Sequence, residues 1–240
     1  MISTFSSSFF SVFKSVFILF KSELRRYVII PLIINISLFS FTTYYVVSEF
    51  SIWMDSLLPS WLDWLNWLIL PLFTISILIV VFYTFTIVAN IIAAPFNSLL
   101  SKKYEQMIRG KTDTEDNETI MQLIIRTLSA ELKKVFYILL WLIPLLVISF
   151  IPVINLISPF LWIIFAIWML SLEYLDYPMG NHNHYFPEVK QTAHQRKSMT
   201  LGLGSGLFIL TIIPLVNFIA IPAGVVAATK VYLDNADKTE

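Results

Sequence analysis

Apolar residues fill four long stretches of the chain, and none of the four contains Lys, Arg, Asp or Glu: residues 27–47, 67–101, 135–172 and 198–229. The second stretch is the strongest candidate for a membrane span. A helix over Trp67 to Ala94 would be about 42 Å long at about 1.5 Å per residue, which exceeds the roughly 30 Å hydrocarbon core of a bilayer. We therefore predict a transmembrane helix over 67–94 that tilts or emerges into water.

The pattern before this span predicts two further helices. Residues 27–47 give 21 residues without a charge, enough for a first transmembrane helix, and Pro31 lies near its start, where a missing N–H is tolerated. Residues 5–24 are amphipathic, because their apolar side chains recur at helical spacing, at Phe9, Phe13, Phe17, Phe20 and Leu24. Such a helix is expected to lie in the inner membrane interface.

Polar signals indicate the topology. Pro95 and Asn97 predict a break or kink at the end of the second span, because proline clashes with the preceding turn and asparagine favours turns. Basic residues from Lys102 onward mark the cytoplasmic side, and we expect a cytosolic helical excursion over 102–134. The loop 48–66 has three acids and no base, so we predict that it is external and that both termini are cytoplasmic.

The remaining apolar regions, 135–172 and 198–229, are each interrupted by the pattern Ile-Pro-x-x-Asn-x-Ile, at 151–157 and at 213–219. The apolar arms beside the interruptions run from about 7 to about 17 residues, short of the roughly 20 that cross a bilayer. We predict two helical hairpins that enter from the inner side and turn within the membrane, each turn being buried in protein or lining a wet cavity. The alternative is two full spans per region, joined by tight external turns.

Composition supports an integral membrane protein. Hydrophobic residues make up 57% of the 240 residues and charged residues 13%, and the mean hydropathy of +0.76 excludes a soluble globule. The predicted fold class is all-α, in a single membrane domain over 1–240. It comprises two long transmembrane helices, two Pro- and Asn-broken hairpins that penetrate only part of the bilayer, and amphipathic and cytosolic helices. The chain has no cysteine, and we expect no signal peptide.

The predicted membrane segments carry no titratable side chain, which argues against a relay of protons through buried carboxylates. They carry amides instead. Amides can line the path of a hydrated anion without trapping it, although an amide between helices more often serves as a hydrogen-bonding contact. The candidates for pore or hairpin positions are Pro95 at the predicted break and the amides Asn35, Asn90, Asn97, Asn155 and Asn217.

Charged residues at the membrane edge offer two further candidates. Arg25 and Arg26 stand where the interfacial helix meets the first span, and guanidinium groups beside a helix start favour a tetrahedral oxyanion. The alternative is that both side chains reach lipid phosphates. Glu105 and Arg109, four residues apart after the Pro95 break, are spaced to pair at the inner mouth of a pore, or to form a plain surface pair.

Two other patterns have simpler explanations. Asp176 and the histidines at 182, 184 and 194 lack the helical spacing of a metal site, so we expect no metal. Gly202 and Gly206, four residues apart in an apolar run, predict a close approach between helices. The sequence contains no nucleophile elbow, P-loop or dinucleotide fingerprint, so we expect neither an enzyme nor a cofactor.

Several uncommon motifs are spread over nearly the whole chain, including Ala89-Asn-Ile-Ile-Ala-Ala-Pro-Phe-Asn97, Leu172-Glu-Tyr-Leu-Asp-Tyr-Pro-Met179 and Pro222-Ala-Gly-Val-Val-Ala-Ala-Thr229. Together they resemble the CysZ family of bacterial sulfate permeases. The resemblance implies a multi-pass protein of the bacterial inner membrane that admits sulfate for assimilation into cysteine, with sulfite and related oxyanions as alternatives. It also implies two long transmembrane helices, two partly penetrating hairpins and assembly into homo-oligomers.

Members of that family typically carry Gly-Leu-Arg-Arg where the first span begins, in a motif associated with sulfate binding. The matching residues here are Glu23, Leu24, Arg25 and Arg26. The resemblance therefore implies anion binding by Leu24, Arg25 and Arg26, with an acid in place of the glycine.

We predict a sulfate permease that behaves as a channel rather than a carrier, in which arginines capture the anion and amides line its path. Its expected partners are sulfate, the lipid bilayer and further copies of the same chain, with no nucleic acid. The alternative is a non-transporting membrane scaffold or a regulatory partner of another transporter. A membrane-embedded enzyme is a third class, and it would need a metal at the 176–194 cluster.

Overall fold

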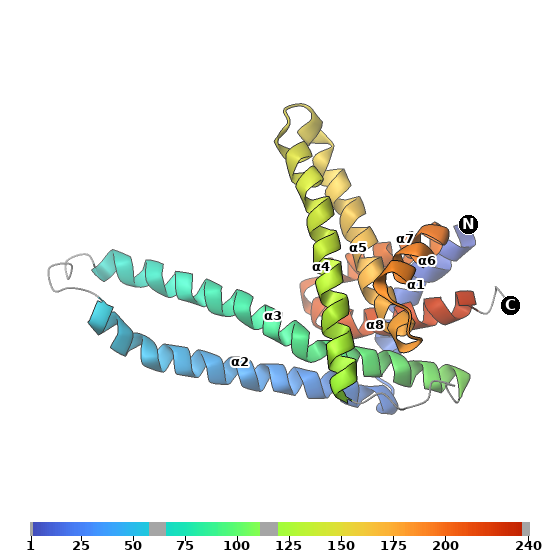
Figure 1. The fold of residues 1–240 in the computed structure, drawn as a ribbon. Coiled ribbons are helices and arrows are strands. Elements are labelled where there is room, and N and C mark those ends of the chain that lie inside the picture. The colour runs from blue at the N-terminus through green and yellow to red at the C-terminus, as the bar shows by residue number, and fades with distance from the viewer. Residues whose placement is uncertain (1, 58–65, 111–119, 237–240) are drawn as a thin grey trace. The chain divides into compact units, whose positions relative to one another are not determined.

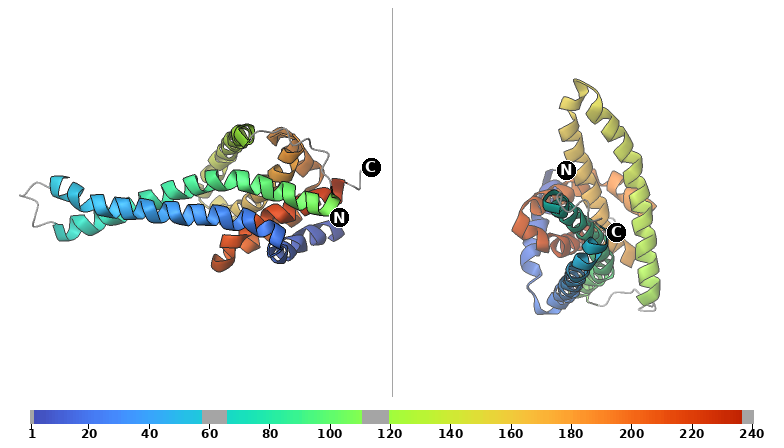
Figure 2. Two further views of the ribbon diagram at one scale, coloured as in Figure 1. Left: turned by 90° about the horizontal axis from the view of Figure 1, so that it is seen from below. Right: turned by 90° about the vertical axis from the view of Figure 1, so that its left-hand side faces the viewer.

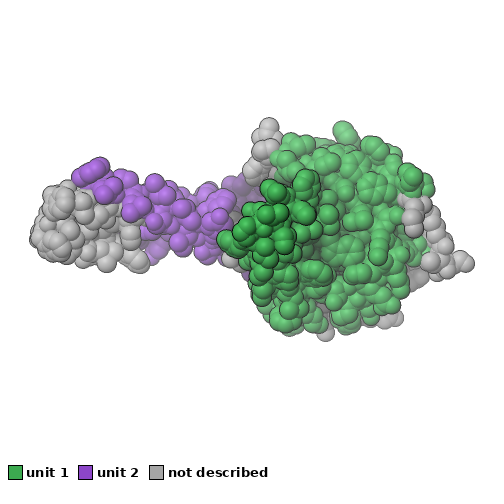
Figure 3. All heavy atoms as spheres, turned by 90° about the horizontal axis from the view of Figure 1, so that it is seen from above, with its two compact units in different colours: residues 1–28, 95–240 green, residues 29–94 purple. Residues whose placement is uncertain are grey.

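The computed structural model describes residues 2–57, 66–110 and 120–236. Over these residues it contains nine helical segments and no strand, which confirms the all-α prediction (Figures 1 and 2). Three of the described stretches are long and apolar enough to cross a membrane, namely Ser22–Val46, Leu132–Phe150 and Ser158–Asn181. The chain groups into two compact units, which Figure 3 colours green and purple: unit 1 is Met1–Val28 with Pro95–Glu240, and unit 2 is Ile29–Ala94.

Unit 2 consists of parts of two long helices, α2 (Ser22–Leu57) and α3 (Asn66–Arg109), which Figure 1 shows as an antiparallel pair. At 36 and 44 residues, the whole helices are about 54 and about 66 Å long. Phe39 of α2 packs edge-on against Phe85 of α3, with 4.8 Å between the ring centroids. Many other apolar side chains of this unit are exposed in the single chain, as expected of helices that face lipid.

Both long helices extend beyond the predicted spans. α2 begins at Ser22 rather than at residue 27, so Pro31 lies in its interior. α3 continues through Pro95 to Arg109, so of the predicted break or kink at Pro95 the break is wrong. A proline removes one intrahelical hydrogen bond, whereas ending the helix in lipid would expose several backbone groups, so continuation costs less. The helix ends before Gly110, whose φ of 81° is a left-handed conformation that glycine adopts without strain.

In unit 1, α1 (Ile2–Ile18) packs against α7 (Lys197–Ile212) and α8 (Pro214–Ala236). The amphipathic helix predicted over 5–24 ends at Ile18, because residues 19–21 form a turn before α2. The buried face of α1 is made of small side chains, Ser8, Ser11, Val12 and Ser15, while several of its phenylalanines are exposed. Small residues at a helix contact let the two backbones approach closely.

Gly202 and Gly206 make this approach possible, as their spacing predicts. A Cβ atom at Gly202 would collide with the carbonyl oxygen of Phe5, and one at Gly206 would lie 2.8 Å from the carbonyl oxygen of Phe9. The contact between α1 and α7 is therefore backbone against backbone, and it confirms the predicted close approach.

The first hairpin is formed by α4 (Ile120–Phe150) and α5 (Ser158–Asn181), which meet at a turn containing the short helix η2 (Ile154–Leu156) (Figures 1 and 2). The turn lies where the Pro-x-x-Asn pattern predicts it. All of residues 151–157 are exposed in the single chain, so the prediction that the turn is buried in protein or lines a wet cavity stays a prediction about the membrane-embedded protein. The turn satisfies part of its own backbone, since the N–H groups of residues 154–157 donate to carbonyl groups of residues 151–154.

The second hairpin turns differently. The chain bends at the extended residue Ile213, and Pro214 begins α8. The second Pro-x-x-Asn pattern therefore lies in the first turn of a helix, and Pro222 lies inside that helix. Two similar sequence patterns thus form different local structures. Between the hairpins, α6 (Phe186–Gln195) links α5 to α7.

Candidate functional site

Arg25 and Arg26 lie in the first turn of α2, directly after the turn that ends α1. The Arg25 Nε donates to the carbonyl oxygen of Phe20 at 2.7 Å, which closes this turn. The Arg26 Nη2 donates to the Tyr27 hydroxyl at 3.0 Å, and its guanidinium lies 4.9 Å from the centroid of the Tyr27 ring. Leu24 beside them is fully buried. A buried leucine thus anchors two exposed guanidinium groups at a helix start.

The acid that precedes this pair does not neutralise it. Among the described residues, no salt bridge joins Glu23 to Arg26, because Arg26 turns toward Tyr27. The N–H groups of Leu24 and Arg25 donate to the Lys21 carbonyl at 3.0 and 3.3 Å, so the helix start is already organised in the absence of an anion. The two arginine side chains are the groups here that can bind one.

The amide candidates do not form one common lining. Asn97 is buried, and its Nδ2 donates to the Tyr177 hydroxyl at 3.5 Å. Asn155 is exposed in the turn of the first hairpin. The amide oxygen of Asn35, in unit 2, is buried and accepts no hydrogen bond within the described structure. The side chains of Asn90 and Asn217 lie outside the part that the structure describes, as does any lining that they form.

A polar seam joins the last turns of α3 to α5 and α8 within unit 1. Ser98 Oγ donates to the Asn181 amide oxygen at 3.0 Å, and the Asn181 Nδ2 donates back to the Ser98 carbonyl at 3.3 Å. Ser101 and Thr229 share a buried hydrogen bond of 2.8 Å. Hydrogen bonds of this kind hold apolar helices together where they have little other polar contact, so the seam supports the interpretation of Asn97 and its neighbours as interhelical contacts.

Glu105 lies at the end of this seam, and its partner differs from the predicted one. Its side chain is fully buried, and its Oε1 lies 2.8 Å from the Nε2 of His182, so the predicted partner Arg109 is replaced by a histidine of the α5 end. The Glu105 Oε2 is buried without a hydrogen bond in the described structure. Arg109 is exposed. Glu105 therefore fastens α3 to α5 rather than forming a surface pair.

A second buried charge was missed from the sequence. The side chain of Lys134 is only 1% exposed, and its Nζ lies 3.0 Å from Glu173 Oε2 and 3.3 Å from Asp176 Oδ2. The lysine precedes the uncharged stretch of 135–172 and the two acids follow it, so folding the stretch into a hairpin brings them together. The sequence did contain a signal for this contact, because the lysine and the two acids lie at similar distances along the chain from the predicted turn.

The aspartate and the three histidines that prompted a metal hypothesis are engaged separately. Asp176 pairs with Lys134, and His182 pairs with Glu105. His184 lies 3.1 Å from Glu188, and His194 bonds the Lys190 carbonyl and packs against Trp168. In the residues that the structure describes, no three His, Cys, Asp or Glu side chains are grouped as metal ligands.

Two tyrosines near the seam have perturbed acidity. Burial raises the pKa of Tyr104 above its ordinary value of 10.0, and the negative charge of Asp234 adds to this effect. Burial also raises the pKa of Tyr232, as does Glu105, while Arg109 and Arg196 oppose the shift. Both hydroxyls are neutral hydrogen-bonding groups over the physiological pH range.

Known proteins are similar to this chain over most of its length. Residues 11–222 match the family model described as sulfate transporter CysZ/etoposide-induced protein 2.4. A sulfate transporter CysZ of Pseudomonas aeruginosa is 39% identical over 217 residues, covering 88% of each chain. That of Pseudomonas syringae pv. tomato is 40% identical over 211 residues, covering 86% of this chain and 83% of the relative. That of Vibrio parahaemolyticus is 35% identical over 216 residues, covering 88% and 87%.

Proposed function

Since this chain belongs to the sulfate transporter CysZ/etoposide-induced protein 2.4 family, we propose that it transports sulfate across a membrane. The observation that carries the proposal is the similarity to sulfate transporters over 86 to 88% of the chain. The membrane is the inner membrane of a bacterium, and the sulfate serves assimilation into cysteine. Sulfite and related oxyanions are secondary substrates.

The exposed arginines are the proposed capture site. Arg25 and Arg26 offer guanidinium N–H groups beside a helix start, and the buried Leu24 holds their backbone in place. A guanidinium binds a tetrahedral oxyanion through paired N–H donors, so two adjacent arginines suit a doubly charged anion. Their exposure keeps the interaction weak enough to release the ion, which transport requires.

The proposed transport is channel-like. The buried charged groups, Lys134 with Glu173 and Asp176, and Glu105 with His182, are engaged with one another. A carrier driven by protons would need carboxylates along the path, and the apolar arms of the hairpins supply none. We also propose that several copies of the chain assemble into homo-oligomers, so that exposed apolar side chains of unit 2 face one another.

The test is uptake of radiolabelled sulfate into liposomes that contain the purified protein. Wild type is compared with Arg25→Ala/Arg26→Ala and with the control Lys14→Ala/Lys197→Ala, which removes two exposed charges elsewhere in unit 1. We expect uptake by wild type and by the control, and loss of most uptake in the arginine variant. Equal uptake by all three would move the capture site elsewhere. No uptake above empty vesicles would refute transport and favour a scaffold or a regulatory partner.

A second measurement distinguishes a channel from a proton-driven carrier. Sulfate flux should follow the sulfate gradient and persist when a protonophore collapses the proton gradient. Uptake that stops on addition of the protonophore would contradict this part of the proposal.

A further inference from the structure

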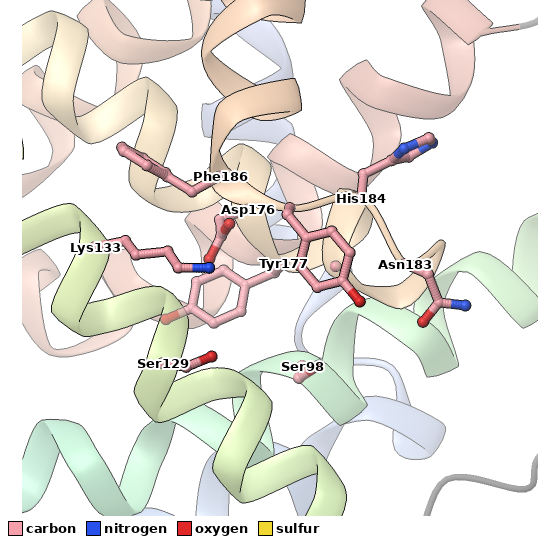
Figure 4. Close-up of a pocket in the computed structure, with 10 residues that line it drawn as sticks. Ser98, Ser129, Lys133, Asp176, Tyr177, Asn183, His184 and Phe186 are labelled. Carbon is pink, nitrogen blue, oxygen red and sulfur yellow. The ribbon is translucent and has the colours of Figure 1, made fainter.

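A pocket lies in unit 1, at the base of the first hairpin, and its described lining does not include Arg25 or Arg26. Side chains from α3, α4, α5 and the loop before α6 line it, and Figure 4 shows several of them converging. The lining consists of one lysine, one aspartate, four hydroxyl residues and four others: Lys133, Asp176, Ser98, Ser129, Tyr177, Tyr185, Gly180, Asn183, His184 and Phe186. The transport proposal does not use this pocket, and the sequence patterns did not indicate it.

The two residues of opposite charge that line the pocket, Lys133 and Asp176, differ in whether they form a salt bridge. Asp176 shares the buried Lys134 with Glu173, at 3.3 and 3.0 Å, so its negative charge is partly offset. Lys133 lines the pocket itself, and no carboxylate of the described residues forms a salt bridge with it. Its Nζ lies 5.9 Å from the centroid of the Tyr185 ring. Lys133 is therefore the cation that faces a ligand in this pocket.

Neutral polar groups complete the lining. Tyr185 and Asn183 are exposed residues that also line the pocket, on a loop that the left-handed residue Asn183 bends, and Tyr185 lies beside Lys133. Hydroxyl and amide groups donate hydrogen bonds to anionic oxygens without adding charge. One cation surrounded by neutral donors replaces the hydration shell of an anion but does not trap it.

We propose that this pocket binds a tetrahedral oxyanion, with Lys133 as the charged contact and neutral hydroxyl and amide groups as the remaining donors. The inference rests on the proposed function, since sulfate is the anion that the protein would admit. The phosphate of a lipid headgroup has the same chemistry, and the pocket lies near the ends of membrane helices, so the test distinguishes the two sources.

Gly180 allows a direct test of the electrostatic argument. It lines the pocket, and a Cβ atom placed on it would meet nothing within 4 Å, so a side chain fits there without displacing its neighbours. Gly180→Asp adds a negative charge to the lining, and Gly180→Asn adds a side chain of the same shape without the charge. A carboxylate this close to the anion should weaken binding by at least about tenfold, because like charges repel strongly in a partly desolvated site.

Binding of labelled sulfate to the purified full-length protein is measured by equilibrium dialysis in the Arg25→Ala/Arg26→Ala background, which removes the proposed capture site. We expect Gly180→Asp and Lys133→Gln to weaken binding, while Gly180→Asn and a control lysine variant on α6, Lys190→Gln, retain it. The lipid arm measures the rise in unfolding temperature when phosphatidylglycerol replaces phosphatidylcholine in mixed micelles. Loss of that rise in Gly180→Asp and Lys133→Gln alone, with sulfate binding unchanged, would assign the pocket to a lipid phosphate.

The remaining outcomes overturn either this inference or the transport proposal, and the two can be told apart. If Gly180→Asp behaves as Gly180→Asn in both arms, the pocket does not bind an oxyanion. The uptake assay separates this failure from failure of the proposed function: wild type that transports sulfate with an unresponsive pocket refutes only the inference. Wild type that binds sulfate in the pocket without uptake refutes only transport.

Discussion

Removal of the buried cation in the first hairpin should destabilise the protein strongly. Lys134→Met keeps the volume of the side chain and deletes its charge, which leaves Glu173 and Asp176 facing each other without a counter-ion. Breaking a buried ion pair by removing one partner costs about 3–5 kcal/mol. Glu173 is 36% exposed, so water screens its share of the cost, whereas Asp176 is 14% exposed and carries most of it.

The expected loss is therefore about 3 kcal/mol, the lower end of that range. For a chain of this size, 1 kcal/mol corresponds to roughly 2–4 °C, so the unfolding temperature of Lys134→Met should fall by about 6–12 °C. The assay is thermal unfolding in detergent at a fixed scan rate. Lys133→Met is the control, since this neighbouring lysine is exposed and forms no salt bridge with the described carboxylates, and its unfolding temperature should change little.

A second substitution tests the cause of the loss. In Lys134→Met/Asp176→Leu, the stranded carboxylate is also removed, and the unfolding temperature should recover most of the difference, because apolar replacement of a whole buried pair is close to neutral. An unfolding temperature of Lys134→Met equal to that of wild type would refute the reasoning. So would a double variant that is less stable than Lys134→Met.

Three further predictions follow from the packing, the turn and the perturbed tyrosines. Gly202→Ala should lower stability by about 1–3 kcal/mol through overpacking against Phe5, whereas Gly180→Ala should not, because a Cβ atom there meets nothing within 4 Å. Thermal unfolding tests this, and Gly202→Ala should unfold at the lower temperature of the two. Because the chain has no cysteine, Val153→Cys gives a single labelling site, and a nitroxide there should be shielded from a water-soluble relaxing agent; ready relaxation would place the turn in water. The pKa values of Tyr104 and Tyr232 are raised in the folded protein, so these two hydroxyls ionise at lower pH in the unfolded chain. The stability present below pH 10 is therefore lost as the pH rises above 10. Phe at both positions should reduce this fall in unfolding temperature at alkaline pH.

The helices could be predicted because uncharged apolar runs of this length have few other structures available to them. The family resemblance, drawn from motifs such as that ending at Asn97, is confirmed by the family model over residues 11–222. The turn of the first hairpin was predicted at the correct residues, since Pro152 and Asn155 both disfavour a continuous helix. The break at Pro95 was wrong, because the same local signal lies in a helix whose flanking turns hold it together.

What the sequence could not reveal were contacts between distant segments. Phenylalanines at helical spacing on α1 predicted a helix in the membrane interface, but they did not reveal that the serine face packs on the protein, where Gly202 and Gly206 of α7 allow close approach. Glu105 was paired with Arg109 by spacing, yet the tertiary structure places His182 closer. Local spacing predicts partners on one helix, and it carries no information about a helix that arrives from elsewhere in the chain.

The depth of the first hairpin follows from combining its charges with its turn. Lys134 on α4 and Glu173 on α5 are joined at 3.0 Å, so the two helices are fixed at one level. From that level α4 rises about 24 Å to Phe150 and α5 about 22 Å to Ser158, both less than the roughly 30 Å hydrocarbon core. If the charges lie at the inner interface, the turn ends inside the hydrocarbon. Four N–H groups are satisfied within the turn, and Val153 and Leu156 present apolar surface, but the exposed amide of Asn155 still needs a polar partner there. A turn at that depth therefore requires protein or water beside Asn155, such as a second copy of the chain or a hydrated cavity.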